Sequence, residues 1–331
     1  MIWMQFVAVA GVIVFAGSNL SKYGDVIAEK TGMGRTWVGV ILIASVTSLP
    51  ELITGISAVS LFDLPDIAVG NVFGACAFNI LTIALLDVLS GATPLSAKAH
   101  QGQVIGAGFG IVLLGLAAIS IAGGAMLPSV GWVSGSSFMF LLVYAIAIHT
   151  VYSFEKKRIA EFVQEMAEAS RYEKISLKRA YLTYAWNALL VIVAAAYLPH
   201  LGEQIAAATG LGRTFVGSIF IALTTTLPEL VVSIAALRIN AADLVFGNLF
   251  GSNLFNLAIL ALDDVFYVKG SLLADVAPAH TVTASAAMAM TAVAMVGLTY
   301  RITKKSFLIA WDSVAILAIY MLGVWVMYSI G

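Results

Sequence analysis

The feature that most constrains this chain is an apolar segment with a single carboxylate that occurs twice. Residues 35–52 read RTWVGVILIASVTSLPEL, and residues 213–230 read RTFVGSIFIALTTTLPEL, with twelve of eighteen positions identical at an offset of 178. Each copy places one glutamate, Glu51 or Glu229, directly after a proline. An ionisable group at membrane depth is costly and is kept where function requires it. The two glutamates are therefore the leading candidates for a functional site.

The prolines before these glutamates predict a broken helix in each copy. Pro50 and Pro228 have no N–H for the carbonyl four residues back, and their rings crowd the preceding turn. Lipid offers no donor, so the freed carbonyl oxygens need protein, water or an ion as a partner. Hydroxyl groups lie on the same helical face, three and four residues before each glutamate; they belong to Thr47, Ser48, Thr225 and Thr226. Such all-oxygen groups are the ligands that Ca²⁺ and Na⁺ prefer.

Composition decides the class of protein. The chain is 61% hydrophobic and 11% charged, with a mean hydropathy of +0.99, which excludes an ordinary soluble domain. Membrane-spanning helices need roughly 20 apolar residues each. Ten runs of this kind are predicted, five in each half, at 2–20, 36–60, 67–89, 103–122, 132–154, 180–199, 214–236, 244–262, 282–300 and 307–330. The first run lacks the basic start of a signal peptide and is interpreted as a membrane helix.

The positions of the basic residues predict the orientation of these spans. With both termini outside, fifteen of the 17 Lys and Arg residues fall in inside connections, and only Arg213 and Lys269 fall outside. Residues 154–179 then form a cytoplasmic linker between repeats at 1–153 and 180–331. An odd number of spans in each repeat orients the two copies oppositely. This inverted repeat predicts a site at the membrane midplane, where broken helices from both halves meet.

The repeat continues downstream of the glutamates. Residues 66–80, DIAVGNVFGACAFNI, match residues 243–257, DLVFGNLFGSNLFNL, at an offset of 177. Residues at equivalent positions of the two copies are here called repeat mates. Polar side chains at helical spacing are expected to line the site from these segments; the positions are Asn71, Ala75 and Asn79 in the first copy and Asn248, Ser252 and Asn256 in the second. Gly70 and Gly74 have the spacing that lets membrane helices approach closely.

These paired motifs resemble a known family. TSLPEL followed by GNVFGACAFN, and TTLPEL followed by GNLFGSNLFN, are similar to the two α-repeats of sodium/calcium exchangers, within the calcium:cation antiporter superfamily. The resemblance implies an all-helical fold of ten spans in two inverted sets of five, with Ca²⁺ and Na⁺ as substrates. It casts as ion ligands Glu51, Glu229, Thr47, Ser48, Thr225, Thr226, Asn79, Asn256 and Ser252. Many members carry serine in place of Ala75 and aspartate in place of Asn256.

Several functions remain open on this scaffold. Two carboxylates balance one Ca²⁺, two Na⁺ or two H⁺, so exchange of Ca²⁺ for Na⁺ by alternating access is the favoured interpretation and H⁺/Ca²⁺ antiport is the alternative. An ion channel is disfavoured, because a channel has no use for two opposed carboxylate motifs. No catalytic motif is present, so no enzyme activity is expected, nor any cofactor or nucleic-acid partner. The expected location is the cell membrane, and the oligomeric state stays open, with a monomer included.

Three further acids near the predicted span ends have two interpretations. Asp87 and its repeat mate Asp264, with Asp263 adjacent, are interpreted as interfacial caps or local ion pairs, with a proton or ion vestibule as the alternative. The four histidines lack metal-ligand spacing. The helices at 2–20 and 180–199 flank the predicted core, and we expect them to move when the site opens.

Overall fold

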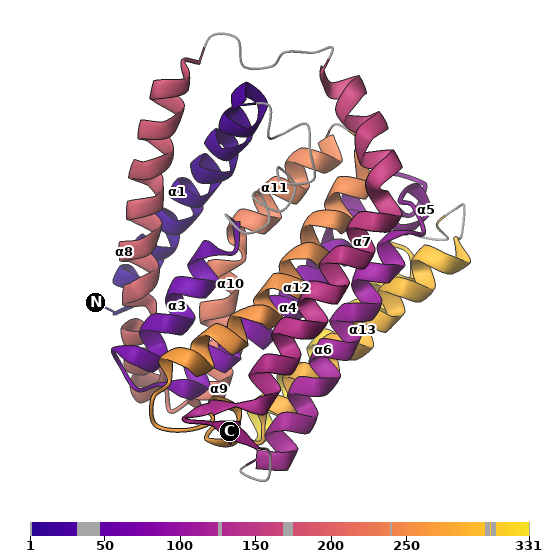
Figure 1. Ribbon diagram of the computed structural model, residues 1–331. Coiled ribbons are helices and arrows are strands. Elements are labelled where there is room, and N and C mark those ends of the chain that lie inside the picture. The colour runs from indigo at the N-terminus through magenta and orange to yellow at the C-terminus, as the bar shows by residue number, and fades with distance from the viewer. Residues whose placement is uncertain are drawn as a thin grey trace.

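The computed structural model shows a helical membrane protein (Figure 1) and describes residues 2–31, 47–124, 128–167, 175–238, 240–301, 305 and 309–330. In these residues, eight helices are long and apolar enough to cross a membrane, or nine if one bent pair counts as a single span. Because every backbone group of a helix is satisfied within the segment, such helices suit a lipid environment. The chain is therefore a multi-pass membrane protein.

The helices follow one another with short connections. The first half contains α1 (Ile2–Thr31), α3 (Leu49–Ser60), α4 (Pro65–Leu89), α5 (Leu95–Lys98), α6 (Gln103–Gly123) and α7 (Gly135–Ala167). The second half contains α8 (Leu177–Thr209), α9 (Arg213–Val216), the π-helical turn η3 (Gly217–Ile221), α10 (Ala222–Thr225), α11 (Leu227–Arg238), α12 (Ala242–Phe266), the 3₁₀ turn η4 (Leu272–Ala274), α13 (His280–Tyr300) and α14 (Trp311–Ile330). A hairpin of β1 (Ser129–Val130) and β2 (Val133–Ser134) precedes α7.

Most predicted spans coincide with helices, and the differences have physical causes. Residues 36–46 of the span predicted at 36–60 lie outside the described residues. The helix predicted to end at residue 199 continues through Pro199 to Thr209, because neighbouring helices can compensate for a proline inside a membrane helix. Helix α7 continues past residue 154 to Ala167, through residues with good helix propensity. Much of the predicted linker at 154–179 is thus helical, and residues 168–174 lie outside the described part.

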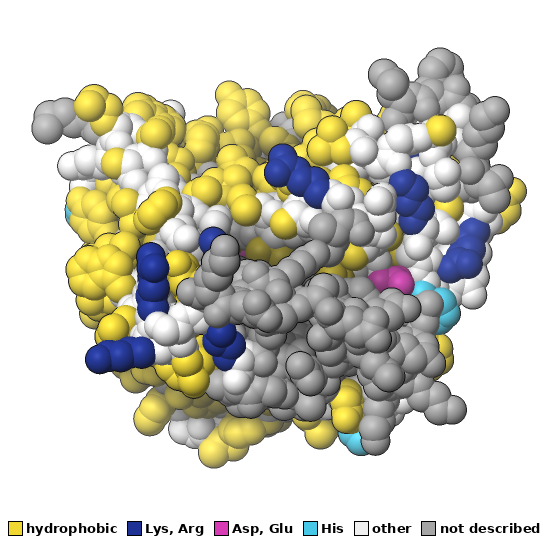
Figure 2. Space-filling model, turned by 90° about the horizontal axis from the view of Figure 1, so that it is seen from above, with side chains coloured by type: hydrophobic (Ala, Val, Ile, Leu, Met, Phe, Trp, Pro, Cys, Tyr) yellow, Lys and Arg dark blue, Asp and Glu magenta, His cyan; other side chains and the backbone are white. Residues whose placement is uncertain are grey.

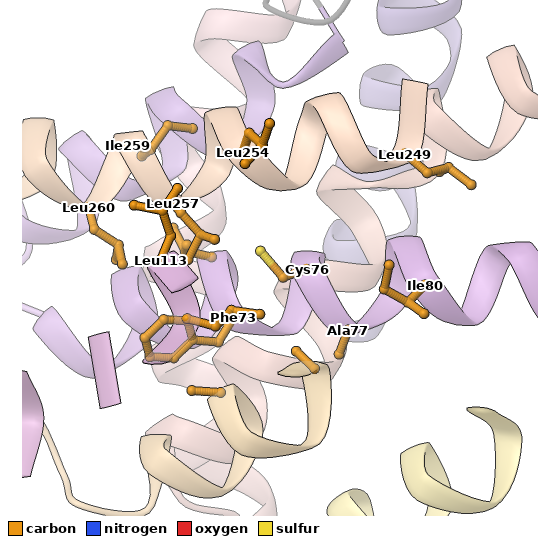
Figure 3. Close-up of a cluster of buried hydrophobic side chains, with 14 of the residues drawn as sticks. Phe73, Cys76, Ala77, Ile80, Leu113, Leu249, Leu254, Leu257, Ile259 and Leu260 are labelled. Carbon is orange, nitrogen blue, oxygen red and sulfur yellow. The ribbon is translucent and has the colours of Figure 1, made fainter. Parts of the chain in front are cut away.

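Helices α4 and α12 form the centre of the molecule and are the most buried of the spans. Their apolar side chains meet in one cluster, in which Cys76 of α4 points toward α12 (Figure 3). Asn253, the repeat mate of Cys76, donates from Nδ2 to the Cys76 carbonyl at 3.1 Å. The two copies therefore meet at this pair.

The glycines of α4 let it pack closely against η3. A Cβ atom built on Gly74 would lie 2.2 Å from the carbonyl oxygen of Ser218, and one built on Gly70 would lie 3.1 Å from the Gly217 Cα. The predicted close approach at this glycine pair is confirmed. It brings the segment that leads to Thr225 against the centre of α4.

Helices α1 and α8 pack together at one side of the centre (Figure 1). Helix α1 also contacts α10 and α11, and α8 contacts α3. A Cβ atom on Gly17 would lie 2.7 Å from Pro228 Cγ, so α1 touches the proline of the second motif directly. In α8, the carbonyl of Ala195 accepts a hydrogen bond from Thr54 Oγ1 at 3.3 Å. The α1–α8 pair therefore contacts both motif helices.

Hydrogen bonds at the ends of α4 and α12 are exchanged between the halves. Asp66 Oδ1, in the first half, accepts from the backbone N–H of Ala277 at 2.8 Å. Its repeat mate Asp243 accepts from the N–H of His100 at 2.6 Å. Ala277 and His100 are themselves repeat mates. The same contact is thus made twice, with the roles of the halves reversed.

Asp87 and Asp264 make a second exchanged set. Each accepts from the N–H eight residues further on, Leu95 at 2.8 Å and Leu272 at 2.7 Å. The other carboxylate oxygen reaches into the opposite half: Asp87 accepts from the N–H of Ala310, and Asp264 from that of Ser134, both at 2.8 Å. Both acids thus cap backbone N–H groups, and Asp87 also pairs with Lys305 at 3.1 Å, in agreement with their interpretation as caps or local ion pairs.

The described residues at the end of the molecule reached by α5 and by the far end of α1 are mainly basic. Figure 2 looks down on this end and, among the side chains that it colours, shows several Lys and Arg and few acidic ones. Lys305 pairs with Asp87 there, and Lys98 donates to the carbonyl of Ser90. At the opposite end Lys269 pairs with Asp63 at 2.5 Å and Arg213 with Glu203 at 2.6 Å. The end that carries the Asp63–Lys269 pair is called the Lys269 face below.

Candidate ion-binding site

The two glutamates begin short helices that follow a break in the chain. Glu51 lies in the first turn of α3 and Glu229 in the first turn of α11. Helices α10 and α11 are bent by 45° at the break between them, at Thr226, as the proline predicts. Proline is tolerated in a first helical turn, because the N–H groups there have no partner within the helix. Ser48 is the equivalent turn residue in the first copy, and residues 32–46 before it lie outside the described part.

Both glutamate side chains are fully buried, and no cationic side chain pairs with them in the part of the chain that the structure describes. Glu51 and Glu229 are each 0% exposed. Ser48 Oγ donates to Glu229 Oε1 at 3.1 Å, whereas Glu229 Oε2 and both carboxylate oxygens of Glu51 have no hydrogen-bond partner among the described residues. Ser48 is three residues before Glu51, so its hydrogen bond to Glu229 brings the two glutamates into the same buried region. Two buried carboxylates without a cation are strongly unfavourable, so this site needs bound cations or protons.

The hydroxyls from one copy lie beside the carboxylate of the other. Ser48 and Thr47 of the first copy lie next to Glu229 of the second. Thr225 of the second copy lies next to Glu51 of the first, although its hydroxyl donates to Asn71 Oδ1 at 2.9 Å. The helical spacing pointed to hydroxyls on the same helix as the glutamate. The structure corrects this, because the crossing of the broken helices brings each turn against the opposite glutamate.

Thr226 is turned away from this arrangement. Its hydroxyl donates to the carbonyl of Ala222 in its own helix. A threonine that bonds to the carbonyl four residues back commonly accompanies a bend in a helix. Of the predicted ligands, Thr226 is therefore placed at the break, where its hydroxyl satisfies the backbone.

Asn71 and Asn248 make the same contact at the two breaks. Asn71 Nδ2 donates to the Glu51 carbonyl at 3.4 Å, and its repeat mate Asn248 donates to the Glu229 carbonyl at 3.3 Å. Asn248 Nδ2 also donates to Ser233 Oγ at 3.0 Å, and its Oδ1 has no hydrogen-bond partner among the described residues. Both amides therefore hold backbone at the start of a motif helix and position the glutamates.

Three other predicted residues present oxygens without partners. The Oδ1 atoms of Asn79 and Asn256 and the Oγ of Ser252 are buried and have no hydrogen-bond partner among the described residues. Ser252 lies next to the Glu229 carboxylate. An unsatisfied buried oxygen needs a partner such as an ion or ordered water. Ala75, the repeat mate of Ser252, contributes only a methyl group, so the two halves differ at this level.

Asn253 has a role that the sequence analysis missed. Its Oδ1 accepts from Asn79 Nδ2 at 2.9 Å while its Nδ2 donates to the carbonyl of Cys76. It therefore orients Asn79 from the opposite helix. Comparison of the two copies did not point to Asn253, because its repeat mate is Cys76. Its polar side chain within the segment GNLFGSNLFN was the only feature of the sequence that indicated a role.

The ligand chemistry of this region is that of a hard cation. No cluster of three or more His, Cys, Asp or Glu side chains able to hold a metal occurs in the part of the chain that the structure describes. The groups that meet here are two carboxylates with hydroxyl and amide oxygens. Oxygen sets of this kind suit Ca²⁺ and Na⁺ and are poor ligands for soft metals.

Comparisons with known proteins agree with this geometry. The family described as sodium/calcium exchanger protein matches residues 1–153 and 179–329. An uncharacterized membrane protein of Methanocaldococcus jannaschii, MJ0091, is 24% identical over 95% of this chain and 94% of its own length. The sodium/calcium exchanger MaX1 of Methanosarcina acetivorans is 25% identical over 74% of this chain and 77% of its own.

Two solved structures have the same fold. The H⁺/Ca²⁺ exchanger CAX superposes with a TM-score of 0.69 at 14% identity, covering 99% of this chain and 85% of the other. The sodium-calcium exchanger NCX_Mj superposes with a TM-score of 0.60 at 22% identity, covering 99% and 100%. At these identities the likeness shows the fold alone.

Proposed function

Since this chain belongs to the sodium/calcium exchanger protein family, we propose that it exchanges Ca²⁺ for Na⁺ across the cell membrane by alternating access. One observation carries the proposal: Glu51 and Glu229 are fully buried and close together, and neither has a cationic partner among the described residues. A site of this kind is stable only when cations or protons neutralise it. Ca²⁺ and Na⁺ then compete for the same two carboxylates.

The transport pathway of this proposal is built from ten spans in two inverted repeats, 1–153 and 180–331. The exchanged hydrogen bonds of Asp66 with Ala277 and of Asp243 with His100 support a two-fold relation between the halves. The basic end in Figure 2 supports a cytoplasmic location for that end and for residues 154–179. Both termini then lie outside, and the chain works within the lipid bilayer without a cofactor. A monomer contains every group that the mechanism uses.

The proposed ligands surround the two carboxylates with neutral oxygens. They are Glu51, Glu229, Thr47, Ser48, Thr225, Asn79, Asn256 and Ser252. Thr226 stays a predicted ligand through its carbonyl oxygen alone, because its hydroxyl donates to Ala222. With amides at 79 and 256, the site has at most two formal negative charges, which one Ca²⁺ or two Na⁺ neutralise. The empty site keeps both charges, so its passage through a closed state is unfavourable and only the loaded forms cross. This charge rule enforces exchange.

Opening toward each side is assigned to the α1–α8 pair. This pair touches the second motif through Gly17 and Pro228 and the first through Ala195 and Thr54. Sliding of the pair against α3 and α11 would expose the carboxylates to one face at a time. Such movement of one bundle around a fixed site is the usual form of alternating access in inverted-repeat transporters.

Protons are the second candidate for the driving ion. Both carboxylate oxygens of Glu51 lack a donor among the described residues, so a proton would neutralise this group as a sodium ion would. Two protons balance one Ca²⁺ as two sodium ions do. The two candidates therefore differ in the gradient that drives uptake.

Calcium uptake into liposomes tests the proposal. The purified protein is reconstituted, and radioactive Ca²⁺ uptake is measured with an outward gradient of Na⁺, K⁺, Li⁺ or H⁺ supplied one at a time. We expect Na⁺ to drive uptake; uptake with H⁺ alone would select the second candidate. The absence of uptake with every cation would contradict both.

The two glutamates are tested by neutral substitution. Glu51→Gln and Glu229→Gln remove one charge each at nearly constant volume, and we expect either to reduce uptake to that of empty liposomes. Glu203→Gln is the matched control, because Glu203 is an exposed acid paired with Arg213 at the surface. The unfolding transition of each variant in detergent confirms that it is folded. Uptake by either site variant at the wild-type rate would overturn the assignment.

A further inference from the structure

Asp263 is a buried acid for which the described part of the chain supplies no hydrogen-bond partner. It lies in α12, is 0% exposed, and neither carboxylate oxygen has a hydrogen-bond partner among the described residues. Its neighbour Asp264 is the opposite case: it accepts from Leu272 N at 2.7 Å, Ser134 N at 2.8 Å and Ser137 Oγ at 2.6 Å. Capping at this end of α12 is therefore performed by Asp264. Asp263 is left without a structural role of that kind.

The Asp263 carboxylate packs against Gly55 of α3, in the space that a larger side chain would fill. A Cβ atom on Gly55 would lie 2.4 Å from its Oδ2 and 2.6 Å from its Oδ1. Gly55 is one helical turn beyond Glu51 on the same face of α3, and Asp263 is two turns beyond Asn256 on the same face of α12. The acid therefore lies along the α3–α12 seam, between the proposed ion site and the Lys269 face.

At the contact between Asp263 and Gly55, both residues differ from their repeat mates. The mate of Asp263 is Leu86, which is 1% exposed, and the mate of Gly55 is Ser233. In the first half, a leucine thus fills the position that corresponds to Asp263. In the second half the chain has an acid instead, and the facing helix has the glycine that makes room for it. Two coordinated departures at one contact indicate a function for the acid.

Among the described residues, the Lys and Arg side chains at this end of the molecule are paired with acids other than Asp263. The titratable and charged groups at this end of the packed elements are Asp264, Glu51, Asp63, Asp66, Glu203, Asp275, Lys269, Arg213, Tyr267, His200 and His280. Asp264 adds negative charge beside Asp263; Lys269 is paired with Asp63, Arg213 with Glu203, and His280 with Asp66. An ionised carboxylate buried without a partner is unfavourable by many kcal/mol, and such a group takes up a proton instead. No group of carboxylates able to hold a metal includes it within the described residues.

We propose that Asp263 is a proton-binding site that controls opening toward the Lys269 face. Asp263 keeps its proton while the site is closed to that face. When the α1–α8 pair moves away from α3 and opens the site to that face, water enters the seam between α3 and α12, reaches the carboxyl group and accepts the proton. Acid on the Lys269 face therefore favours the closed form, and a higher pH favours the open form. This inference rests on the proposed function and adds regulation by protons at a second place.

The effect differs in kind from competition at Glu51 and Glu229. A proton at the central pair competes with Ca²⁺, so it raises the apparent KM and saturating Ca²⁺ overcomes it. A proton at Asp263 leaves the central site intact and reduces the population that opens, so it lowers the maximal rate. The effect also belongs to one face, because Asp263 lies on one side of the central site. These two properties separate the sites in one experiment.

The test measures the maximal Ca²⁺ flux at saturating Ca²⁺ while only the pH on the Lys269 face is varied. We expect the maximal rate of the wild type to fall as the pH on this face is lowered. The fall should approach about tenfold per pH unit, as the binding of a single proton predicts. Asp263→Asn, which is neutral at every pH, and Asp263→Leu, which installs the residue of the mate, should both lose this slope. Asp63→Asn removes an exposed acid on the same face and should keep it.

Infrared difference spectroscopy on the purified protein gives a readout that does not depend on transport. The carbonyl band of a protonated carboxylic acid should be present in the wild type and in Asp63→Asn, and should lose intensity in Asp263→Asn. An unchanged band, or an unchanged slope of the maximal rate in Asp263→Asn, would overturn the inference. So would saturable binding of a monovalent metal ion that Asp263→Asn abolishes. If the wild type moves no Ca²⁺, the proposed function fails, and the infrared band alone still decides the state of Asp263.

Discussion

The packing of α4 against η3 gives a prediction with a magnitude. In Gly74→Ala, the new Cβ would lie 2.2 Å from the Ser218 carbonyl oxygen and 2.6 Å from Ala222 Cβ. Ordinary contact begins at 3.4 Å, so the two helices must separate by about 1.2 Å. The nearest obstacle is backbone, which cannot rotate away as a side chain can. Overpacking of this kind destabilises by about 1–3 kcal/mol.

Gly110→Ala is the matched control for this substitution. A Cβ atom on Gly110, in α6, meets no atom within 4 Å. Alanine is favoured over glycine in a helix by about 1 kcal/mol, so Gly110→Ala should stabilise slightly. The same gain partly offsets the clash in Gly74→Ala and leaves a net loss of about 1 kcal/mol, and of no more than about 2 kcal/mol. The same chemical change is thus expected to act in opposite directions at the two positions.

The assay compares unfolding transitions of the purified proteins in one detergent at one scan rate, since large proteins often unfold irreversibly. Gly74→Ala should unfold below the wild type and Gly110→Ala at or above it. Calcium uptake should also fall in Gly74→Ala, because η3 leads directly to Thr225 beside Glu51. An unfolding midpoint of Gly74→Ala equal to that of the wild type would refute the account of this helix contact.

Two other substitutions test features outside the carboxylate pair. Asp264→Asn replaces one acceptor oxygen by a donor that faces N–H or hydroxyl donors, and should destabilise by about 1–3 kcal/mol in the same unfolding assay; an unchanged midpoint would count against its capping role. Cysteines introduced at Thr54 and Ala195, on neighbouring helices α3 and α8, should be joined by a short bifunctional thiosulfonate reagent, and this cross-link should stop Ca²⁺ uptake until it is reduced. Full uptake by the completely cross-linked protein would show that α8 does not move against α3.

The sequence predicted those parts of the structure that both copies share. Apolar length located the spans, and proline chemistry located the break at Thr226, because both depend on neighbouring residues. The burial of Glu51 and Glu229 followed from their place in apolar runs. The standing of these residues as ion ligands remains a prediction that transport assays must test.

Features that belong to one copy, or to contacts between distant segments, escaped the sequence analysis. The environment of Asp263 depends on Gly55, about two hundred residues earlier, and the mate of each is a different kind of residue. Asn253 acquires its role from Asn79 on another helix. The π-helical turn at 217–221 lies against Gly70 and Gly74, so its form depends on tertiary packing. Periodicity within a segment contains no information about such partners.

The exchanged contacts of Asp66, Asp87, Asp243 and Asp264 bear on how such a molecule can arise. Carboxylates of each half accept hydrogen bonds from backbone N–H groups of the other half. Under the proposed inverted repeat, two polypeptides of half the length inserted in opposite directions would supply such acceptors to each other. Gene duplication and fusion of such a pair would then be a sufficient origin for this architecture. In the present chain the two copies differ at single contacts, as Asp263 and Gly55 illustrate.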